Sequence, residues 1–327
     1  MVSPSTPASG AGAPGRASPT APDGLFANRE LSFLEFNQRI VAEAAGPAVP
    51  LLERLKFVAI VGANLDEFYM VRVAGLEQQL KSGVLETGPD GMLPSEQLAA
   101  IQARTARQVR EVEAIAADLF RALADHGVRL VSVSELDAAA RAHVRAHFER
   151  QLFGMLTPLA VDPGHPFPLL RNRSLNLAVH LLPEDAPEGS VPLLAVVQVP
   201  ALVDRFVEVP HADAFVAVFV EDVIRNHVAA LFTGMRILEC VPFRVLRNWD
   251  LSFDEDEQDD LLATVRKELQ RRWRLDAVRL EIDATASGEL VDRLRGSLEL
   301  RAEAVQRFSG ALAWTDLSRV LDRVGRS

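Results

Sequence analysis

The sequence predicts an α+β fold, in which an N-terminal α-helical bundle is followed by a mixed α/β domain. Three observations indicate this fold class. Apolar residues recur at helical spacing through most of residues 25–127. Strand-like apolar runs, separated by Pro- and Gly-rich loops, dominate after residue 128. These strands are interleaved with helices without the strict βαβ alternation of a doubly wound sheet.

Residues 25–127 carry several signals of helix ends. Ser32 and Glu35 have capping-box spacing, and Asn64 stands where an N-cap would open a further helix. Gly127 stands where a helix C-cap is expected. We expect one helix from Ser32 to Ala44, a second from Leu51 to about Ile60, a third opened by Asn64, and a long one from Pro94 to about Ala124.

The rest of the chain alternates between strands and helices. We expect strands at Val128–Val133, Leu175–Leu182, Val191–Val199, Arg205–Val209, Phe215–Val220, Ile237–Leu246, Val278–Ile282 and Ala304–Phe308. We expect helices at Ser134–Leu156, Glu221–Phe232, Asp256–Arg274 and Glu289–Leu298. The predicted division is a disordered tail at 1–24, a helical domain at 25–127, an α+β domain at 128–315, and the start of a truncated linker helix at 316–327.

Composition limits the function classes. The net charge of −10 argues against a nucleic-acid-binding surface as the theme of the whole chain. The single cysteine, Cys240, excludes an internal disulfide and argues against a cysteine-based metal site. No apolar stretch reaches the ~18 residues of a membrane span, and the Pro- and Ala-rich N-terminus lacks the apolar core of a signal peptide. We therefore expect a cytoplasmic protein.

The basic residues are almost all arginine. Only Lys56, Lys81 and Lys267 are lysines among the 35 basic residues. Arginine can hold phosphate bidentately, but an Arg- and Ala-rich genomic composition explains the same bias. Both interpretations stay open at this point.

Several catalytic motifs are absent from the sequence. It contains no Gly-x-x-x-x-Gly-Lys phosphate loop, and its one Gly-x-Gly-x-x-Gly run, Gly10–Gly15, lies in the Pro- and Ala-rich N-terminus and not between a strand and a helix, so it is no dinucleotide-binding fingerprint. It also lacks the Gly-x-Ser-x-Gly elbow and the His-Glu-x-x-His zinc helix. By motif alone the chain does not read as a complete enzyme.

Two regions resemble a known family. The segments Asn28–Arg39, Pro50–Phe57 and Asn64–Gly75 resemble the opening of the long, histidine-phosphorylating bacterial polyphosphate kinases. The segments Leu156–Leu169 and Ser174–Val179 are similar to the middle, or head, domain of that family. The resemblance implies a helical N-terminal domain followed by a mixed α/β head domain.

The resemblance also implies an activity. The full family enzyme reversibly transfers the γ-phosphate of ATP to polyphosphate through a phosphohistidine. Downstream phospholipase-D-like domains, which this sequence lacks, supply that histidine and the Mg²⁺ site. No catalytic residue and no metal ligand is therefore assigned here, and we expect the chain alone to be inactive. Implied partners are ATP, polyphosphate, and either a second copy, through the head domain, or a separate catalytic half.

Asn64 is the one binding residue that the resemblance assigns. In the family, the asparagine of this Asn-Leu-Asp-Glu-Phe motif contacts ATP, and the helical domain covers the adenine. The alternative is that Asn64 only caps its helix, since asparagine is among the best N-caps. Both roles are compatible, because a helix start presents polar groups well.

Other acidic and basic residues near Asn64 have structural alternatives. Asp66 and Glu67 could form a catalytic carboxylate pair, but adjacent helical residues point in different directions. Acids in a first helical turn also oppose the helix dipole, so we interpret both as structural. Arg72 could reach a phosphate, but a surface salt bridge is the favoured interpretation.

Histidines and an acidic run complete the candidates. His165 lies in a Pro/Gly loop and is not the transfer histidine of the family. His143 and His147 are four residues apart on a helix and could hold a metal, but no third ligand is indicated and a solvated face is favoured. The run Asp254–Asp260 could bind magnesium, although acids commonly begin a solvent-facing helix.

Two hypotheses of different classes remain. The first is the N-terminal and head portion of a polyphosphate kinase, which helps to bind ATP and to dimerise; a split or truncated gene, with the remainder encoded next door, is a further possibility. The second is a catalytically inert, stand-alone nucleotide-binding or dimerisation module that regulates an intact kinase.

Overall fold

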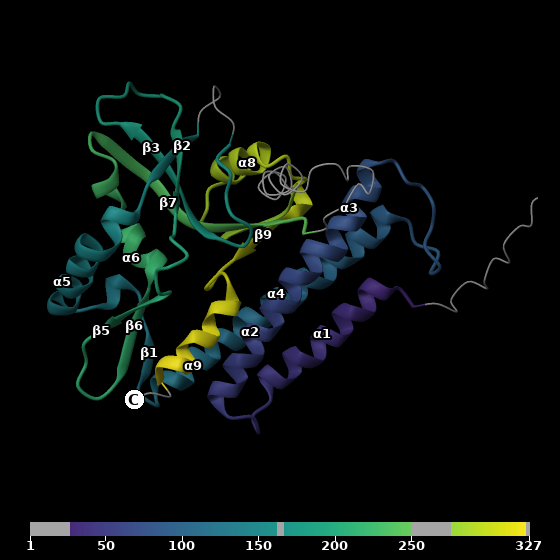
Figure 1. Ribbon diagram of the computed structural model, residues 1–327, viewed down its shortest axis with the longest axis horizontal. Helices are drawn as coiled ribbons and strands as arrows, with labels where there is room; N and C mark the ends of the chain where they lie inside the picture. The colour runs from purple at the N-terminus through teal and green to yellow at the C-terminus, as the bar shows by residue number, and fades with distance from the viewer. Residues whose placement is uncertain (1–26, 162–166, 250–275, 325–327) are drawn as a thin grey trace, which may run out of the picture.

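The computed structural model describes residues 27–161, 167–249 and 276–324 and confirms the predicted α+β fold class (Figure 1). Its α-helices are α1 (Arg29–Ala45), α2 (Leu51–Glu67), α3 (Ala74–Lys81), α4 (Pro94–Ala124), α5 (Ala138–His147), α6 (Val220–His227), α8 (Gly288–Ser297) and α9 (Arg319–Val324). Its strands are β1 (Val128–Leu130), β2 (Pro158–Val161), β3 (Leu175–Pro183), β4 (Leu193–Gln198), β5 (Phe206–Val209), β6 (Phe215–Phe219), β7 (Met235–Arg247), β8 (Ala277–Asp283) and β9 (Val305–Phe308). The predicted tail (1–24) and the predicted helix Asp256–Arg274 lie outside the described residues.

Helices α1, α2 and α4 pack side by side as the N-terminal bundle. Each buries an apolar stripe at helical spacing, such as Leu34 and Val41 of α1 or Leu98 and Ile101 of α4. Burial of each such side chain contributes about 1.5–3 kcal/mol. The bundle is therefore held mainly by its apolar stripes, as the periodicity predicts.

Helix α2 does not break where the sequence predicted. It runs unbroken through Ile60 and Asn64 and continues directly into a π-helical turn, η1 (Phe68–Val73). The predicted helix end near Ile60 and the predicted N-cap role of Asn64 are therefore wrong. The physical reason is tertiary packing. Gly62 lets α2 pack closely against Trp314, because a Cβ at position 62 would lie only 2.9 Å from the Cβ of Trp314.

Two other predicted caps are also wrong. Helix α1 begins earlier, at Arg29, and its N-cap is Asn28, whose Oδ1 accepts the backbone N–H of Leu31 at 2.8 Å. Helix α5 begins later, at Ala138, and its N-cap is Asp137, whose Oδ1 accepts the backbone N–H of Ala140 at 2.8 Å. Ser134 instead belongs to a preceding short 3-10 turn. In both cases a competing Asn or Asp lies within a few residues and makes the better cap.

Two sheets form the head region. The larger has the strand order β2-β4-β3-β7-β8-β9 and is antiparallel except for the β8–β9 pair. The smaller has the order β1-β6-β5, with β1 and β6 parallel. Strand β2 was not predicted; it begins with a proline and lies at a sheet edge, where proline is tolerated.

The larger sheet is covered on both faces. Along β3, Leu177 and Val179 pack toward α6 and the smaller sheet, whereas Ala178 packs toward α8. This explains why nearly all of β3 is buried and why its sequence reads as a continuous apolar run.

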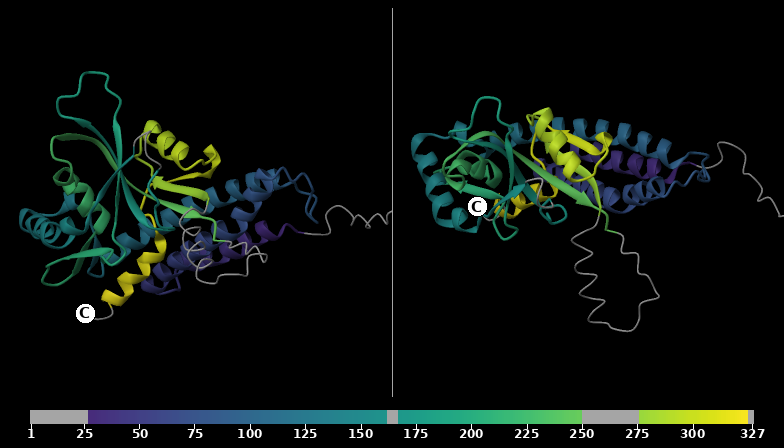
Figure 2. Two further views of the ribbon diagram at one scale, coloured as in Figure 1. Left: turned by 45° about the horizontal axis from the view of Figure 1, so that its top comes forward. Right: turned by 90° about the horizontal axis from the view of Figure 1, so that it is seen from above.

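The C-terminal segment returns to the N-terminal bundle. Figures 1 and 2 show α9 beside the bundle helices, and the preceding 3-10 turn η7 (Trp314–Ser318) packs against α2. Trp314 is buried and meets the ring of Phe308 edge-on at 5.4 Å. One apolar core thus joins the bundle to the head region. The predicted domain division stays a prediction.

None of the helices in the described part of the chain is long and apolar enough to cross a membrane.

Candidate functional site

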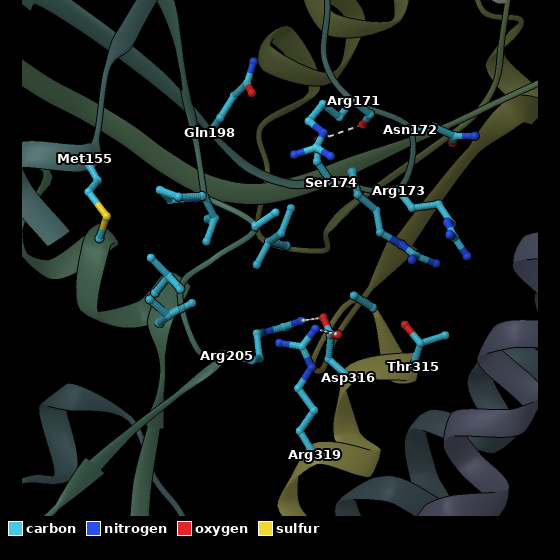
Figure 3. A pocket seen from close by; sticks show the side chains of 18 of the residues that line it. Met155, Arg171, Asn172, Arg173, Ser174, Gln198, Arg205, Thr315, Asp316 and Arg319 are labelled. Carbon is cyan, nitrogen blue, oxygen red and sulfur yellow. Dashed lines mark hydrogen bonds and ion pairs between the residues drawn. The ribbon is translucent and has the colours of Figure 1, made fainter. Parts of the chain in front are cut away.

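A pocket of about 670 Å³ lies where the bundle, the head sheet and the C-terminal turn meet (Figure 3). Its walls come from segments far apart in the sequence: the end of α2, the loop before β3, the loop between β4 and β5, strand β7, and residues 313–319. The site therefore exists only in the folded chain.

The loop 171–174 forms one wall and is firmly anchored. The side-chain oxygen of Asn172 accepts the backbone N–H of Arg247 at 3.0 Å, and its amide donates to Met70 Sδ at 3.2 Å. The Arg173 N–H donates to the carbonyl oxygen of Val245 at 3.0 Å. Arg173 has φ 62°, a left-handed conformation that costs a non-glycine residue about 1–2 kcal/mol.

The opposite wall carries a buried arginine (Figure 3). Arg205 Nε donates to Glu221 at 2.9 Å, and its Nη1 donates to Asp316 Oδ2 at 3.1 Å. Arg319 contacts the other Asp316 oxygen at 3.3 Å. Both oxygens of Asp316 are thus engaged by guanidinium groups.

A second buried ion cluster closes the pocket beside α2. Arg244 donates to both oxygens of Asp66, one at 3.1 Å, and also to Glu281. Arg279 lies 3.1 Å from Glu281 and stacks 4.0 Å from the ring centre of Tyr69. Burial raises the pKa of Asp66, although Arg244 opposes that shift. Burial lowers the pKa of Arg244, but Glu281 and Asp66 outweigh it and hold that pKa above its ordinary value.

The pocket is positively charged in a chain with a net charge of −10. Two carboxylates line it, Asp66 and Asp316, and each is bound by arginine. The arginines that line it are Arg171, Arg173, Arg205, Arg244 and Arg319. Arg171 and Arg173 are exposed, and the charge of Arg173 helps Arg244 to oppose the rise in the pKa of Asp66. The lining therefore favours an anionic ligand.

Asn64 lies on α2, two residues before Asp66, and is not among the described residues that line the pocket. Its side-chain amide donates to Asn37 Oδ1 at 3.1 Å. Asn37 donates in turn to Gln108 at 3.5 Å, and Gln108 donates to the carbonyl oxygen of Leu34 at 2.7 Å. Asn37 and Gln108 are fully buried, so they fix the orientation of the half-buried Asn64 amide.

Comparison with known proteins identifies the family. The model of the polyphosphate kinase N-terminal domain matches residues 26–131, and that of the polyphosphate kinase middle domain matches residues 139–320. The chain belongs to the polyphosphate kinase family. This confirms the resemblance inferred from the two sequence regions.

Curated polyphosphate kinases match almost the whole chain. The polyphosphate kinase of Mycolicibacterium gilvum is 40% identical over 312 residues, which are 93% of this chain and 42% of that protein. That of Thermosynechococcus vestitus is 42% identical over 299 residues, 89% of this chain and 40% of the relative. The chain thus spans about two fifths of the length of the curated relatives it matches.

A solved structure shares the fold. The crystal structure of polyphosphate kinase from Porphyromonas gingivalis aligns with a TM-score of 0.73 at 26% sequence identity. The alignment covers 90% of this chain and 41% of that one. The arrangement of bundle and sheets described above is therefore that of the polyphosphate kinase family.

The remaining predicted candidates in this chain fall into three groups. His143 and His147 lie on α5, and within the described residues no group of three or more His, Cys, Asp or Glu side chains could hold a metal ion. Arg72 is exposed on η1, without the predicted salt bridge to any described residue. His165 and the run Asp254–Asp260 lie outside the described residues.

Asp66 has a structural role, but for a different reason from the one predicted. It sits at the end of α2, not in a first helical turn, and pairs with Arg244. Sequence reasoning missed Arg244, Arg205 and the loop arginines. Only the loop arginines could have been recognised in the sequence, because the run Arg171-Asn-Arg-Ser174 stands between a Pro-rich segment and a buried strand.

Proposed function

We propose that the chain is the N-terminal and head portion of an ATP:polyphosphate phosphotransferase that transfers the γ-phosphate of ATP reversibly through a phosphohistidine. The observation that supports it most is that two family models match in order along nearly all of the described chain. In this proposal the portion binds ATP and dimerises, or pairs with a separate catalytic half, in the cytoplasm.

Asn64 supplies the proposed contact to adenine. Its NH₂ group is occupied by Asn37, while its carbonyl oxygen has no hydrogen-bond donor among the described residues. A fixed carbonyl oxygen can accept a hydrogen bond from the exocyclic amine of adenine, but not from the carbonyl oxygen of guanine. The hydrogen-bonded amides of Asn64, Asn37 and Gln108 thus support a preference for ATP over GTP.

Catalysis is proposed to need residues outside this portion. Mg²⁺ requires oxygen ligands in near-octahedral arrangement, and the two pocket carboxylates, Asp66 and Asp316, are already bound by arginine. These two carboxylates therefore do not fit a Mg²⁺ ion. We expect the metal of the full enzyme to be held elsewhere, and the chain alone to be inactive.

An assay with γ-labelled ATP tests the proposal. The purified chain is incubated with Mg²⁺, with and without a separately expressed catalytic half, and both protein-bound phosphate and acid-insoluble polyphosphate are scored. Label is expected only in the mixture. Label in the chain alone would contradict the expected inactivity, and label in neither sample would favour the inert nucleotide-binding or dimerisation module.

The role of Asn64 is tested in the active mixture. Asn64→Ala should raise the KM for ATP by about tenfold, the effect of losing one hydrogen bond to a bound ligand. Gln78→Ala, which removes an exposed amide from the nearby helix α3, is the matched control and should leave the KM unchanged. An unchanged KM in Asn64→Ala would reject the adenine contact.

A further inference from the structure

Three side-chain amides form a row through the N-terminal bundle, from Asn64 on α2 through Asn37 on α1 to Gln108 on α4. Asn64 donates to Asn37 at 3.1 Å, and Asn37 donates to Gln108 at 3.5 Å. Asn37 and Gln108 are fully buried, whereas Asn64 is half-buried. This amide row therefore connects the interior of the bundle to its surface.

The direction of the hydrogen bonds is set at the interior end of the amide row. A side-chain amide has an oxygen that only accepts and an NH₂ group that only donates, so each amide could lie either way round. Nε2 of Gln108 lies 2.7 Å from the backbone carbonyl oxygen of Leu34, which can only accept. The NH₂ group of Gln108 must therefore face Leu34, and its oxygen must face Asn37.

A second acceptor holds Gln108 the same way round. Its Nε2 also donates to Oε1 of Gln38 at 3.1 Å. Nε2 of Gln38 in turn donates to the carboxylate of Glu111 at 2.9 Å, and an ionised carboxylate only accepts. Turning Gln108 over would bring its oxygen against two other oxygens, and buried polar groups without a partner are costly.

The same polarity passes outward to Asn64. Because the oxygen of Gln108 faces Asn37, the NH₂ group of Asn37 must face Gln108 and its oxygen must face Asn64. Asn64 then has to turn its NH₂ group inward, which leaves its carbonyl oxygen for a ligand. Without this constraint an asparagine at the surface could present either group, and it would discriminate poorly between a donor and an acceptor.

We propose that Gln108 is a positioning residue for nucleotide specificity, which acts through Asn37 on the amide orientation of Asn64. Gln108 is fully buried, so it cannot reach a ligand itself. The oxygen that Asn64 presents accepts from the exocyclic amine of adenine, whereas the carbonyl oxygen of guanine would face another oxygen. The inference rests on the proposed adenine contact of Asn64, and it adds which residues determine the group that Asn64 presents.

Nuclear magnetic resonance of the 327-residue chain tests the orientation without any catalysis. The side-chain amide signals of Asn64 are identified by their loss in Asn64→Ala, and their exchange with water is measured. In the unaltered chain, exchange should be about tenfold slower than for an exposed asparagine, because one orientation is favoured by about one hydrogen bond.

Gln108→Met keeps the length of the side chain but removes its amide. Both orientations of Asn64 should then be populated, and exchange through the outward-facing one should leave only about twofold protection. Protection that is unchanged in Gln108→Met would overturn the proposal.

Nucleotide selectivity in the active mixture measures the consequence for function. In Gln108→Met the ratio of kcat/KM for ATP to that for GTP should fall by about tenfold, the effect of losing one oriented hydrogen bond. The KM values should change and the kcat for ATP should not, because only the contact to the base is altered. An unchanged ratio, or a parallel loss with both nucleotides, would overturn the specificity role.

Thr105→Val is the matched control. It removes another buried hydrogen bond of the bundle, that between Thr105 and the hydroxyl of Tyr69 at 2.8 Å, and leaves the amide row intact. It should lower the urea midpoint about as much as Gln108→Met, since each loses buried hydrogen bonding. The amide protection of Asn64 and the nucleotide ratio should both stay unchanged, and a fall in either as large as in Gln108→Met would overturn the proposal.

A second variant and the two readouts keep the possible failures apart. Asn37→Leu removes the acceptor of Asn64 itself, so it should lower the ratio at least as far, and it decides the matter where Gln108→Met does not fold. An inactive mixture would reject the proposed function, and the amide protection would still decide whether Gln108 orients Asn64.

Discussion

The buried ion cluster between α2 and the head sheet allows a quantitative test of how the two regions are joined. It contains two guanidinium groups, Arg244 and Arg279, and two carboxylates, Asp66 and Glu281, all less than a tenth exposed. The charges balance. Replacing Arg244 by methionine leaves both carboxylates facing Arg279 alone, with one buried negative charge uncompensated.

The expected magnitudes follow from that balance. Removing one partner of a buried ion pair typically costs ~3–5 kcal/mol, so Arg244→Met should lower the free energy of unfolding by about that much. Asp66→Asn should cost only about 1–3 kcal/mol, because Arg244 keeps Glu281. The double variant leaves Glu281 with Arg279, a balanced pair. Its loss should therefore be smaller than the sum of the single losses by about 1–3 kcal/mol.

Urea unfolding, followed by far-UV circular dichroism and by tryptophan fluorescence, measures these differences. Lys56→Met is the control. It breaks a surface pair with Glu53 in which both side chains are 52% exposed, and it should cost at most about 1 kcal/mol. A loss below about 1 kcal/mol for Arg244→Met, or strictly additive losses, would refute the reasoning. Separate transitions for the two probes in Arg244→Met would show that bundle and head then unfold independently, and hence that the cluster couples them.

Three further predictions concern packing and titration. Gly62→Ala should lower the free energy of unfolding by ~1–2 kcal/mol, because overpacking against Trp314 at 2.9 Å outweighs the helix propensity of alanine. Gly75→Ala, where no atom lies within 4 Å, should instead stabilise by ~0.5–1 kcal/mol, and equal effects would reject the packing argument. Burial raises the pKa of Cys240 to about 12, so at pH 8 its reaction with a disulfide reagent should be about a thousandfold slower than that of a thiol with the ordinary pKa of 9.0. Fast labelling of the native protein would contradict that burial. Burial lowers the pKa of His180 below 6.5, so the unfolded chain binds more protons and stability should fall as the pH drops below 6.5. His180→Gln should flatten this pH dependence of the urea midpoint, and an unchanged slope would reject the assignment.

The sequence predicted the fold class and most elements because the determining signals are local. The stripe of α4 and the apolar run of β3 each lie in one continuous segment. The helix boundary at Asn64 was wrong because an asparagine in this position resembles an N-cap in any local pattern. The helix continues past it and packs through Gly62 against Trp314, which lies about 250 residues further along the chain and is invisible to a local pattern.

The pocket was not predictable for the same reason. Arg244 and Arg205 are two arginines among many, and only the pairing of strands places them opposite Asp66 and Asp316. The bias toward arginine was visible in the composition, but nothing in it said which arginines would be left without a carboxylate. The loop Arg171–Ser174 was the one recognisable local clue.

Helix α2 presents two different faces to the two regions of the chain. Gly62 and Asp66 are four residues apart and share one face, which meets Trp314 and Arg244. Asn64, two residues from each, is turned about 200° away and instead faces Asn37 of the bundle, to which its side-chain amide donates. One helix thus holds Asn64, the residue of the proposed adenine contact, and Asp66, which lines the pocket, in fixed relation to each other.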